Sequence, residues 1–326
     1  MITPSIAAPD RTPLRATVIL SSYNGAARLP RTLESLARQT LPADQWELLA
    51  VDNNSADETF EVLMQYHELL PLVPLNHPVP GKSGALNAAI ALARGDLVVF
   101  TDDDVEADPN WLATLVACAE IRPDFGIFGG RIVPEWERRP DAPFLSWIPL
   151  GSTFAVIDQA ESGPCDPDKV WGPNTAIRRS LLTPDVRYRE DIGPMPGGHF
   201  AMGEDLEIVL RLARRGVRTW RCAEAVIHHF VPAHSMNERW VQRRAERLGY
   251  GVPAIFPEDV PKGPRLSGVP LRTWLQTLGW AARAALLYPL PSSRLRFWAI
   301  WKTYYMRGYI AGLRRYAAPA LSNGGR

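Results

Sequence analysis

Short apolar runs alternate with segments of helical spacing over the first hundred residues. The apolar runs have the length of buried strands, and they cover Ala16–Ser21, Trp46–Val51, Leu72–Leu75 and Leu97–Thr101. Between them, apolar residues recur every three or four positions at Leu29–Gln39, Glu58–Tyr66 and Ala85–Ala93. This alternation predicts an α/β fold, with a doubly wound, mostly parallel sheet flanked by helices.

The alternation continues less regularly to about residue 235. We predict a helix over Asp108–Glu120, with Asp108 as its cap and Pro109 at its first position, and another over Leu206–Arg215. Further strands are expected at Phe125–Val133, Val217–Trp220 and Ala225–Ile227, and loops at Glu135–Pro149 and Arg189–Gly203.

The pattern changes after Arg239, where Pro-rich connectors separate helices predicted over Leu271–Tyr288 and Arg294–Tyr316. We therefore predict two parts, an α/β unit over residues 1–235 and a helical extension over residues 236–326. The net charge of +1 hides an asymmetry between them, because the extension holds fifteen Lys and Arg against four Asp and Glu. The α/β unit is correspondingly acidic.

The extension is also rich in Trp and Tyr, a composition that suits an anionic membrane surface or a nucleic acid. Nucleic-acid binding leaves the acidic front unexplained, so we expect no nucleic-acid partner. Three interpretations of residues 236–326 stay open: helices lying in the interface of an anionic membrane, a subdomain packed on the α/β unit, or an oligomer interface.

Cysteine content and targeting signals bear on the compartment. The chain has three cysteines and no CxxC pair, which favours a reducing compartment over a disulfide framework or a zinc site. The N-terminus lacks a signal pattern, and no apolar run reaches the ~18–20 residues that span a bilayer. We expect a cytoplasmic location, at the inner face of the cell membrane.

The strongest chemical signal is the run Asp102-Asp103-Asp104, which follows the buried segment Leu97–Thr101 directly. Adjacent carboxylates repel one another, and open α/β sheets bind ligands at the carboxyl ends of their strands. A divalent cation would remove the repulsion, and Mg²⁺ or Mn²⁺ is commonly held by one or two carboxylates together with substrate phosphates. The alternative is an Asp-rich turn.

Other polar residues are expected at the same edge of the sheet. Asp52 follows a second predicted strand, and Ser21 and Ser22 end the first one. Their convergence predicts a nucleotide-diphosphate site. The loop Gly81-Lys82-Ser83-Gly84 opens a helix and is either a phosphate-binding loop or an ordinary connection.

Two features have both a functional and a structural interpretation. Glu204-Asp205 begins a helix after a Gly- and Pro-rich loop that could close over a site, but acidic residues there also favour the helix dipole. His228 and His229 follow a predicted strand, where one of them could reach a metal or a phosphate. Lone histidines are more often structural.

Several enzyme classes lack their signals here. The chain has no GxGxxG, no Walker A spacing and no GxSxG elbow, which counts against dinucleotide-dependent dehydrogenases, P-loop enzymes and α/β-hydrolases. A nucleotidyltransferase would share the sheet and the acids, but usually carries a Gly-rich N-terminal loop. It stays open as an alternative, as does a non-catalytic nucleotide- or nucleic-acid-binding protein.

Five motifs in order resemble glycosyltransferase family 2, the inverting GT-A nucleotide-sugar transferases, over about residues 16–250. The motifs are Val18-Ile19-Leu20-Ser21-Ser22-Tyr23-Asn24, Val51-Asp52-Asn53-Asn54-Ser55-Ala56-Asp57, Gly84-Ala85-Leu86-Asn87-Ala88-Ala89, Thr101-Asp102-Asp103-Asp104 and Gly203-Glu204-Asp205. The second is similar to the family's VDDGSTD, the fourth to its DXD and the fifth to its ED motif.

The resemblance implies a transferase that moves a sugar from a nucleotide-diphosphate donor to an acceptor hydroxyl, with Mn²⁺ or Mg²⁺ as cofactor and Asp205 as the base. It places the donor on Ser21, Tyr23, Asp52, Asn53, Lys82, Asp102 and Asp103, with Asp103 as the variable middle residue of the DXD. It places the metal on Asp104, Asp102 and His229, and the acceptor near Trp171, Asn174 and Glu204.

The chain departs from the family pattern at two points. Asn53 stands where a second Asp often contacts the nucleotide base, and an amide has donors that a carboxylate lacks, so the preferred base stays open. Arg239-Trp240 lacks the Gln of the processive signature QxxRW, which favours single addition. The segment 225–249 resembles members that act on lipid-linked or polysaccharide acceptors at a membrane, through His229, Val231-Pro232, Arg243-Arg244 and Gly249.

Overall fold

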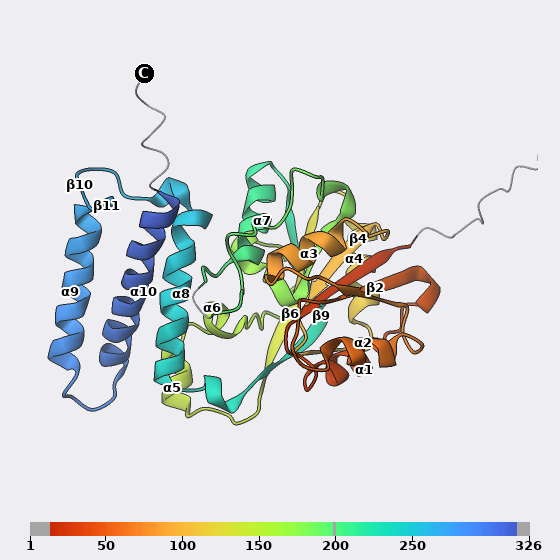
Figure 1. Ribbon diagram of the computed structural model, residues 1–326, viewed down its shortest axis with the longest axis horizontal. Coiled ribbons are helices and arrows are strands. Elements are labelled where there is room, and N and C mark those ends of the chain that lie inside the picture. The colour runs from red at the N-terminus through yellow and green to blue at the C-terminus, as the bar shows by residue number, and fades with distance from the viewer. Residues whose placement is uncertain (1–13, 198–199, 318–326) are drawn as a thin grey trace, which may run out of the picture.

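The computed structural model describes residues 14–197 and 200–317, and it has a helix-covered sheet beside a layer of long helices (Figure 1). The strands are β1 (Ala16–Ser22), β2 (Trp46–Asp52), β3 (Leu72–Asn76), β4 (Leu97–Thr101), β5 (Val105–Ala107), β6 (Ile127–Trp136), β7 (Gly163–Pro164), β8 (Thr175–Arg178), β9 (Thr219–Val231), β10 (Arg265–Leu266) and β11 (Val269–Pro270). The helices are α1 (Leu29–Ala37), α2 (Thr59–Tyr66), α3 (Lys82–Ile90), α4 (Trp111–Ile121), α5 (Ala142–Trp147), α6 (Leu150–Phe154), α7 (Glu204–Arg214), α8 (Glu238–Ile255), α9 (Leu271–Leu287) and α10 (Arg294–Tyr316).

Within the described residues, nine strands form one sheet in the order β3-β2-β1-β4-β8-β6-β9-β5, and β7 pairs with β9. The first four strands are parallel because a helix joins each to the next. β8 runs antiparallel to β4 and β6, and β5 runs antiparallel to β9. The register sets Ser22 beside Asp52 and Leu20 beside Thr101, so the three strands end at one edge of the sheet.

Alternate side chains of the central strands bury two apolar layers, one on each face of the sheet. Val18 and Leu20 belong to the layer that packs on α1 and α4. Ile19 and Val98 belong to the layer that packs on α3 and α7. The helix-flanked sheet predicted from the apolar runs is confirmed, and burial on both faces explains why those runs are nearly continuous.

β9 corrects the prediction of two strands at Val217–Trp220 and Ala225–Ile227, because it runs unbroken over Thr219–Val231. The register against β6 shifts between Cys222 and Val226, and the exposed Glu224 lies in that bulge. A polar residue at a bulge interrupts the apolar pattern without ending the strand. His228 and His229 therefore lie inside β9 and do not follow it.

Two further boundaries differ from the prediction. The segment Glu135–Pro149 contains α5, which begins at Ala142 and carries Pro143 in its first turn, where proline is tolerated. The helix predicted from Asp108 begins at Trp111 and has no side-chain cap. Asp108 contributes instead through its backbone oxygen, which accepts from Trp111 N at 2.9 Å.

The long helices α8, α10 and α9 lie side by side in that order (Figure 1). α8 and α10 approach closely, since a Cβ added at Gly308 would lie 1.8 Å from the backbone oxygen of Glu246. Phe297 and Trp301 of α10 share a buried apolar cluster with Val241 of α8. Over the described ranges, every helix is too short or too polar to cross a bilayer.

Candidate active site

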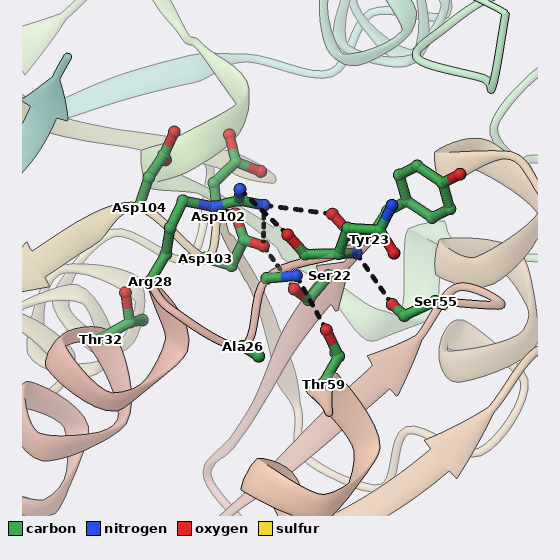
Figure 2. A network of polar contacts seen from close by, with 12 residues as sticks. Ser22, Tyr23, Ala26, Arg28, Thr32, Ser55, Thr59, Asp102, Asp103 and Asp104 are labelled. Carbon is green, nitrogen blue, oxygen red and sulfur yellow. Dashed lines mark hydrogen bonds and ion pairs between the residues drawn. The ribbon is translucent and has the colours of Figure 1, made fainter. Parts of the chain in front are cut away.

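Asp103, the middle carboxylate of the run after β4, is held by the loop after β1. Ser22 Oγ donates to Asp103 Oδ2, and Arg28 Nη2 donates to the same oxygen at 2.8 Å (Figure 2). Asp103 is only 8% exposed. Burial raises the pKa of Asp103, and the Arg28 guanidinium opposes that rise. Asp103 therefore fixes the loop through Arg28, a residue that the sequence motifs did not single out.

The loops after β1 and β2 are tied together by side chains of the second loop. Asn24 N donates to Ser55 Oγ at 2.9 Å, and Gly25 N donates to Thr59 Oγ1 at 2.8 Å (Figure 2). Asp52 belongs to this scaffold, because its Oδ1 accepts from Ser55 N at 3.0 Å. Its carboxylate orders the loop and does not line either cavity described below.

Lys82, at the start of α3, lies among three carboxylates. Its Nζ is 2.7 Å from Asp102 Oδ1 and 3.8 Å from both Glu204 Oε1 and Asp205 Oδ2. Burial alone lowers the pKa of Lys82, but the carboxylates outweigh it, Asp102 most of all, so the pKa is raised well above its ordinary value. The ammonium group therefore joins the acids that follow β4 to those that begin α7.

Two cavities meet at this lysine. The first has a volume of about 350 Å³ and is lined by Ser21, Tyr23, Arg28, Asn53, Asp103 and the segment Pro194–Pro196. The second, of about 400 Å³, is lined by Glu204, Asp205, His229, Trp171 and the inner side of α8. Lys82, Asp102, Asp104, Pro194 and Phe200 line both cavities. Groups bound in the two cavities would thus meet over these residues.

Asp205 has the properties of a base at this junction. Burial, opposed by Lys82 and assisted by Glu204 and Asp102, raises the pKa of Asp205 from 3.8 to about 7. The 3₁₀ turn Gly172–Asn174 packs on it, and a Cβ at Gly172 would lie 1.9 Å from Asp205 Oδ2. A carboxylate with a pKa near neutrality can accept a proton and release it again without large cost.

Asp104 and His229 lie next to each other and present oxygen and nitrogen atoms of the kind that bind a cation. Asp104 Oδ1 is buried and has no hydrogen-bond partner among the described residues, while Asp104 Oδ2 is 3.5 Å from His229 Nε2. His229 Nδ1 lies 2.8 Å from the Phe154 carbonyl oxygen, so Nδ1 carries the hydrogen there and Nε2 presents its lone pair. The pairing of β5 with β9 brings the two residues together, since His229 lies opposite Val105.

Electrostatics at this pair agree with that geometry. Burial alone raises the pKa of Asp104, but His229 lowers it, and the net shift is downward. Burial alone lowers the pKa of His229, but Asp104 raises it, and the net shift is upward. The Asp104 carboxylate thus favours positive charge at its Oδ2 and at His229 Nε2.

The donor set fits one divalent cation that completes its shell with ligand oxygens. Over the described ranges, no three His, Cys, Asp or Glu side chains gather into a preformed metal cage. Mg²⁺ and related ions are commonly held by one or two carboxylates plus phosphates, and the unpartnered Asp104 Oδ1 together with His229 Nε2 supplies such a partial set.

Most of the residues named from the sequence lie at this junction. Among the residues to which the family resemblance gives a role, Asp52 and Asn174 line neither cavity. Ser22 and His228 also line neither, since Ser22 bonds to Asp103 and His228 to Asp108. Asn174 is fully buried, accepts from Trp111 Nε1 at 2.8 Å and donates to the backbone oxygens of Arg131 and Ala225. It ties α4 to β6 and β9. The predicted loop 189–203 lines both cavities, except that Gly198 and His199 fall outside the described residues.

Comparison with known proteins identifies a family and several relatives of this chain. The family model described as glycosyl transferase family 2 matches residues 17–182. The chain is similar to a glucosyl-dolichyl phosphate glucuronosyltransferase of Haloferax volcanii, at 30% identity over 243 residues, which are 73% of this chain and 76% of the relative. It is also similar to an O-antigen chain rhamnosyltransferase of Salmonella typhimurium, at 25% identity over 66% of each chain.

Solved structures share the fold. A mannosyltransferase from Pyrobaculum calidifontis in complex with GDP-Man and Mn²⁺ aligns with a TM-score of 0.59 at 22% identity, over 95% of this chain and 90% of that one. Staphylococcus aureus TarS in complex with UDP aligns with a TM-score of 0.53 at 17% identity, over 95% and 93%. At these identities the likeness concerns the fold alone.

Proposed function

Because this chain belongs to glycosyl transferase family 2, and is a glycosyltransferase with the GT-A fold, we propose that it transfers a sugar from a nucleotide-diphosphate donor to an acceptor hydroxyl with inversion. The observation that carries the proposal is the position of Asp205, whose pKa burial raises to about 7, where the two cavities meet. Family membership argues against the nucleotidyltransferase and nucleic-acid-binding alternatives.

The donor occupies the first cavity in this proposal. Tyr23 and Asn53 line it as well and face the nucleoside. Asn53 Oδ1 already accepts from Gly81 N at 3.1 Å, so its amide NH₂ is left to read the base. Arg28 and Lys82 supply positive charge at the diphosphate.

The acceptor occupies the second cavity, and Asp205 takes the proton from its hydroxyl as that oxygen attacks the anomeric carbon. Attack from the side opposite the leaving diphosphate inverts the anomeric centre. Lys82, 3.8 Å from Asp205 Oδ2, stabilises the carboxylate before it accepts the proton. Positioned general-base catalysis is worth ~10²–10⁴-fold in rate.

Asp104, with His229 and Asp102, would hold Mn²⁺ or Mg²⁺ together with the donor diphosphate. When bound, the ion supplies positive charge that neutralises the leaving diphosphate. The chain's own part is to present Asp104 Oδ1, which has no other partner among the described residues, and to fix the tautomer of His229 through Phe154. A solved structure of the same fold was determined with GDP-Man and Mn²⁺.

A panel of nucleotide-sugars, incubated with the full chain and Mn²⁺, tests the proposal. We expect one donor to release its nucleoside diphosphate in the presence of an acceptor, and Asp205→Asn to lower turnover ~10²–10⁴-fold with donor affinity unchanged. Asp96→Asn, at an exposed carboxylate before β4, is the matched control. Wild-type turnover by Asp205→Asn would overturn the assignment of the base, and NMR of the product's anomeric proton tests inversion.

The relatives support an acceptor class for this chain. They are named for transfer to a glucosyl-dolichyl phosphate, to an O-antigen chain and to poly(ribitol-phosphate). We propose that this chain likewise acts in the synthesis of a cell-surface polysaccharide or glycolipid, and that it adds a single sugar.

The outer face of α9 supports a second element of the proposal, peripheral association with an anionic bilayer. Leu271, Leu275, Leu278 and Leu286 are exposed on α9, the outermost helix of the layer (Figure 1). The sequence from residue 260 to residue 326 holds eleven Lys and Arg and no Asp or Glu. Exposed leucines among unopposed cations complement the headgroups and acyl chains of an anionic leaflet.

A further inference from the structure

A stripe of α8 forms one wall of the second cavity. Five residues at intervals of four, four, four and three line this cavity, namely Trp240, Arg244, Leu248, Val252 and Ile255. This spacing places them on one face of the helix. Arg244 is the single charged member of a stripe that is otherwise apolar. Its sequence neighbour Arg243 is exposed.

Arg244 has no carboxylate partner within the described ranges. Its Nε donates to the Ser152 carbonyl oxygen at 3.3 Å, and its guanidinium lies over the Trp240 ring at 5.4 Å from the centroid. By contrast, Arg28 beside the first cavity is paired with Asp103. A guanidinium has five donors, and only the Nε of Arg244 has a hydrogen-bond partner among the described residues.

The surroundings of Arg244 disfavour its charged form. Burial, followed by repulsion from Arg247, lowers the pKa of Arg244 to about 10, and the acids Glu204, Asp104 and Asp102 offset this only in part. Those acids have cations of their own, since Lys82 pairs with Asp102 and lies near Glu204, and His229 pairs with Asp104. A cation that lines a cavity without an anion of its own indicates that the anion comes with a ligand.

The position of Arg244 separates it from the donor. Arg28 and Lys82 are the cations that line the first cavity, whereas Arg244 lines only the second. The planar guanidinium fork binds phosphate through two parallel hydrogen bonds, and the surrounding Trp240, Leu248 and Val252 suit an apolar group next to that phosphate.

We propose that Arg244 binds a phosphate group of the acceptor, so that this enzyme selects acceptors in which a phosphate adjoins an apolar group. The inference rests on the proposed function, because it takes the second cavity to be the acceptor side. It goes further by assigning the anchoring residue and the acceptor chemistry. Asp205 lines the same cavity. In this proposal it contacts the hydroxyl of an acceptor whose phosphate is bound by Arg244.

Phenyl phosphate is a minimal probe of this site, and benzyl alcohol is its neutral counterpart. Titration calorimetry on the full chain is expected to show binding of phenyl phosphate and none of benzyl alcohol at equal concentrations. Arg244→Gln should weaken phenyl phosphate binding about tenfold or more, which is the loss of a charge-assisted contact, and Arg244→Lys should retain part of it. Arg243→Gln, with the exposed neighbour, is expected to bind as the wild type does.

A second titration separates the acceptor phosphate from the donor diphosphate. UDP and GDP with Mn²⁺ test the proposed donor site directly, and Arg244→Gln is expected to bind them as the wild type does. If the variant loses nucleoside diphosphate binding as strongly as phenyl phosphate binding, Arg244 belongs to the donor site and the inference is overturned. If UDP and GDP bind the wild type but phenyl phosphate does not, the inference fails while the proposed function stands.

Discussion

The charge state of a single side chain, Asp205, sets the pH at which this site can work. Its pKa lies near 7 because it is buried, although Lys82, 3.8 Å away, opposes the shift. At pH 5 the carboxyl group is mostly protonated and cannot accept a proton. The proposed base is therefore available only when the pH rises through about 7.

We expect kcat/KM to rise about tenfold per pH unit below pH ~7 and to level off above it. Rates measured across this range in wild type and in Asp96→Asn should give the same profile, because Asp96 is exposed and precedes β4, at the opposite end of that strand from Asp102. A flat profile between pH 5 and pH 8 would remove Asp205 as the titrating base.

The same shift makes a prediction for stability. The folded-state pKa of about 7 lies above the ordinary value of 3.8, so the folded state binds more protons between these values, and ionised Asp205 destabilises it as pH rises. Without ligands, Asp205→Asn should melt at a higher temperature than wild type at about pH 8 and at the same temperature near pH 4. A lower melting temperature at pH 8 would show that Lys82 outweighs burial.

Gly172 offers a test of positioning without removing the base. A Cβ there would lie 1.9 Å from Asp205 Oδ2, so Gly172→Ala must displace the carboxylate. We expect kcat to fall roughly 10²-fold with donor affinity unchanged. Gly163→Ala, where a Cβ meets nothing within 4 Å, serves as the control and should retain full activity.

At the scale of elements, the same substitution should have opposite effects in adjacent helices. A Cβ at Gly308 of α10 would lie 1.8 Å from the backbone of α8, whereas one at Gly279 of α9 meets nothing within 4 Å. We expect Gly308→Ala to cost about 1–3 kcal/mol of unfolding free energy and Gly279→Ala to add up to about 1 kcal/mol through helix propensity. Urea unfolding compares the two, and a stable Gly308→Ala would mean that α10 does not need its close approach to α8.

The sequence predicts elements well where burial is uniform. β1, β2 and β4 are buried on both faces, so their apolar runs match the strands within one residue. β9 was divided in two because Glu224 lies in a bulge. α5 was missed because Pro143 in its first turn resembles a loop residue.

The sequence likewise predicts some residues of the site and misses others. Asp102, Asp104 and Asp205 were found because acids next to apolar segments stand out in the sequence. Arg28 was not, because an arginine at the start of a helix is usually solvated and only the fold shows that it lines a cavity. Arg244 stands in the segment that resembles members with lipid-linked or polysaccharide acceptors, but only the fold shows that it lines the second cavity. The available signal for Arg244 was its four-residue spacing from Trp240 and Leu248, which places the three on one face of a helix.

Across the whole molecule, the acidic excess lies in the α/β unit, whereas the basic excess and the exposed leucines of α9 lie together in the C-terminal extension. We expect the full protein to co-sediment with anionic vesicles and to be released as salt is raised. Leu275→Asp combined with Leu278→Asp should abolish binding. Leu69→Asp, at a leucine of the α/β unit that is 70% exposed like Leu275, should not. Loss of self-association instead of vesicle binding in the double variant would identify α9 as a contact between copies of the chain.

The ammonium group of Lys82 has a consequence for the pKa of Asp205 when the donor binds. It bonds to Asp102 on one side and lies 3.8 Å from Asp205 on the other. An arriving diphosphate competes for that ammonium, and as Lys82 turns toward it, Asp205 loses its nearest positive charge and becomes more basic. We therefore expect the pKa of Asp205 to rise further when the nucleotide-sugar binds, so that the pH profile of the donor complex lies at higher pH than that of the free enzyme.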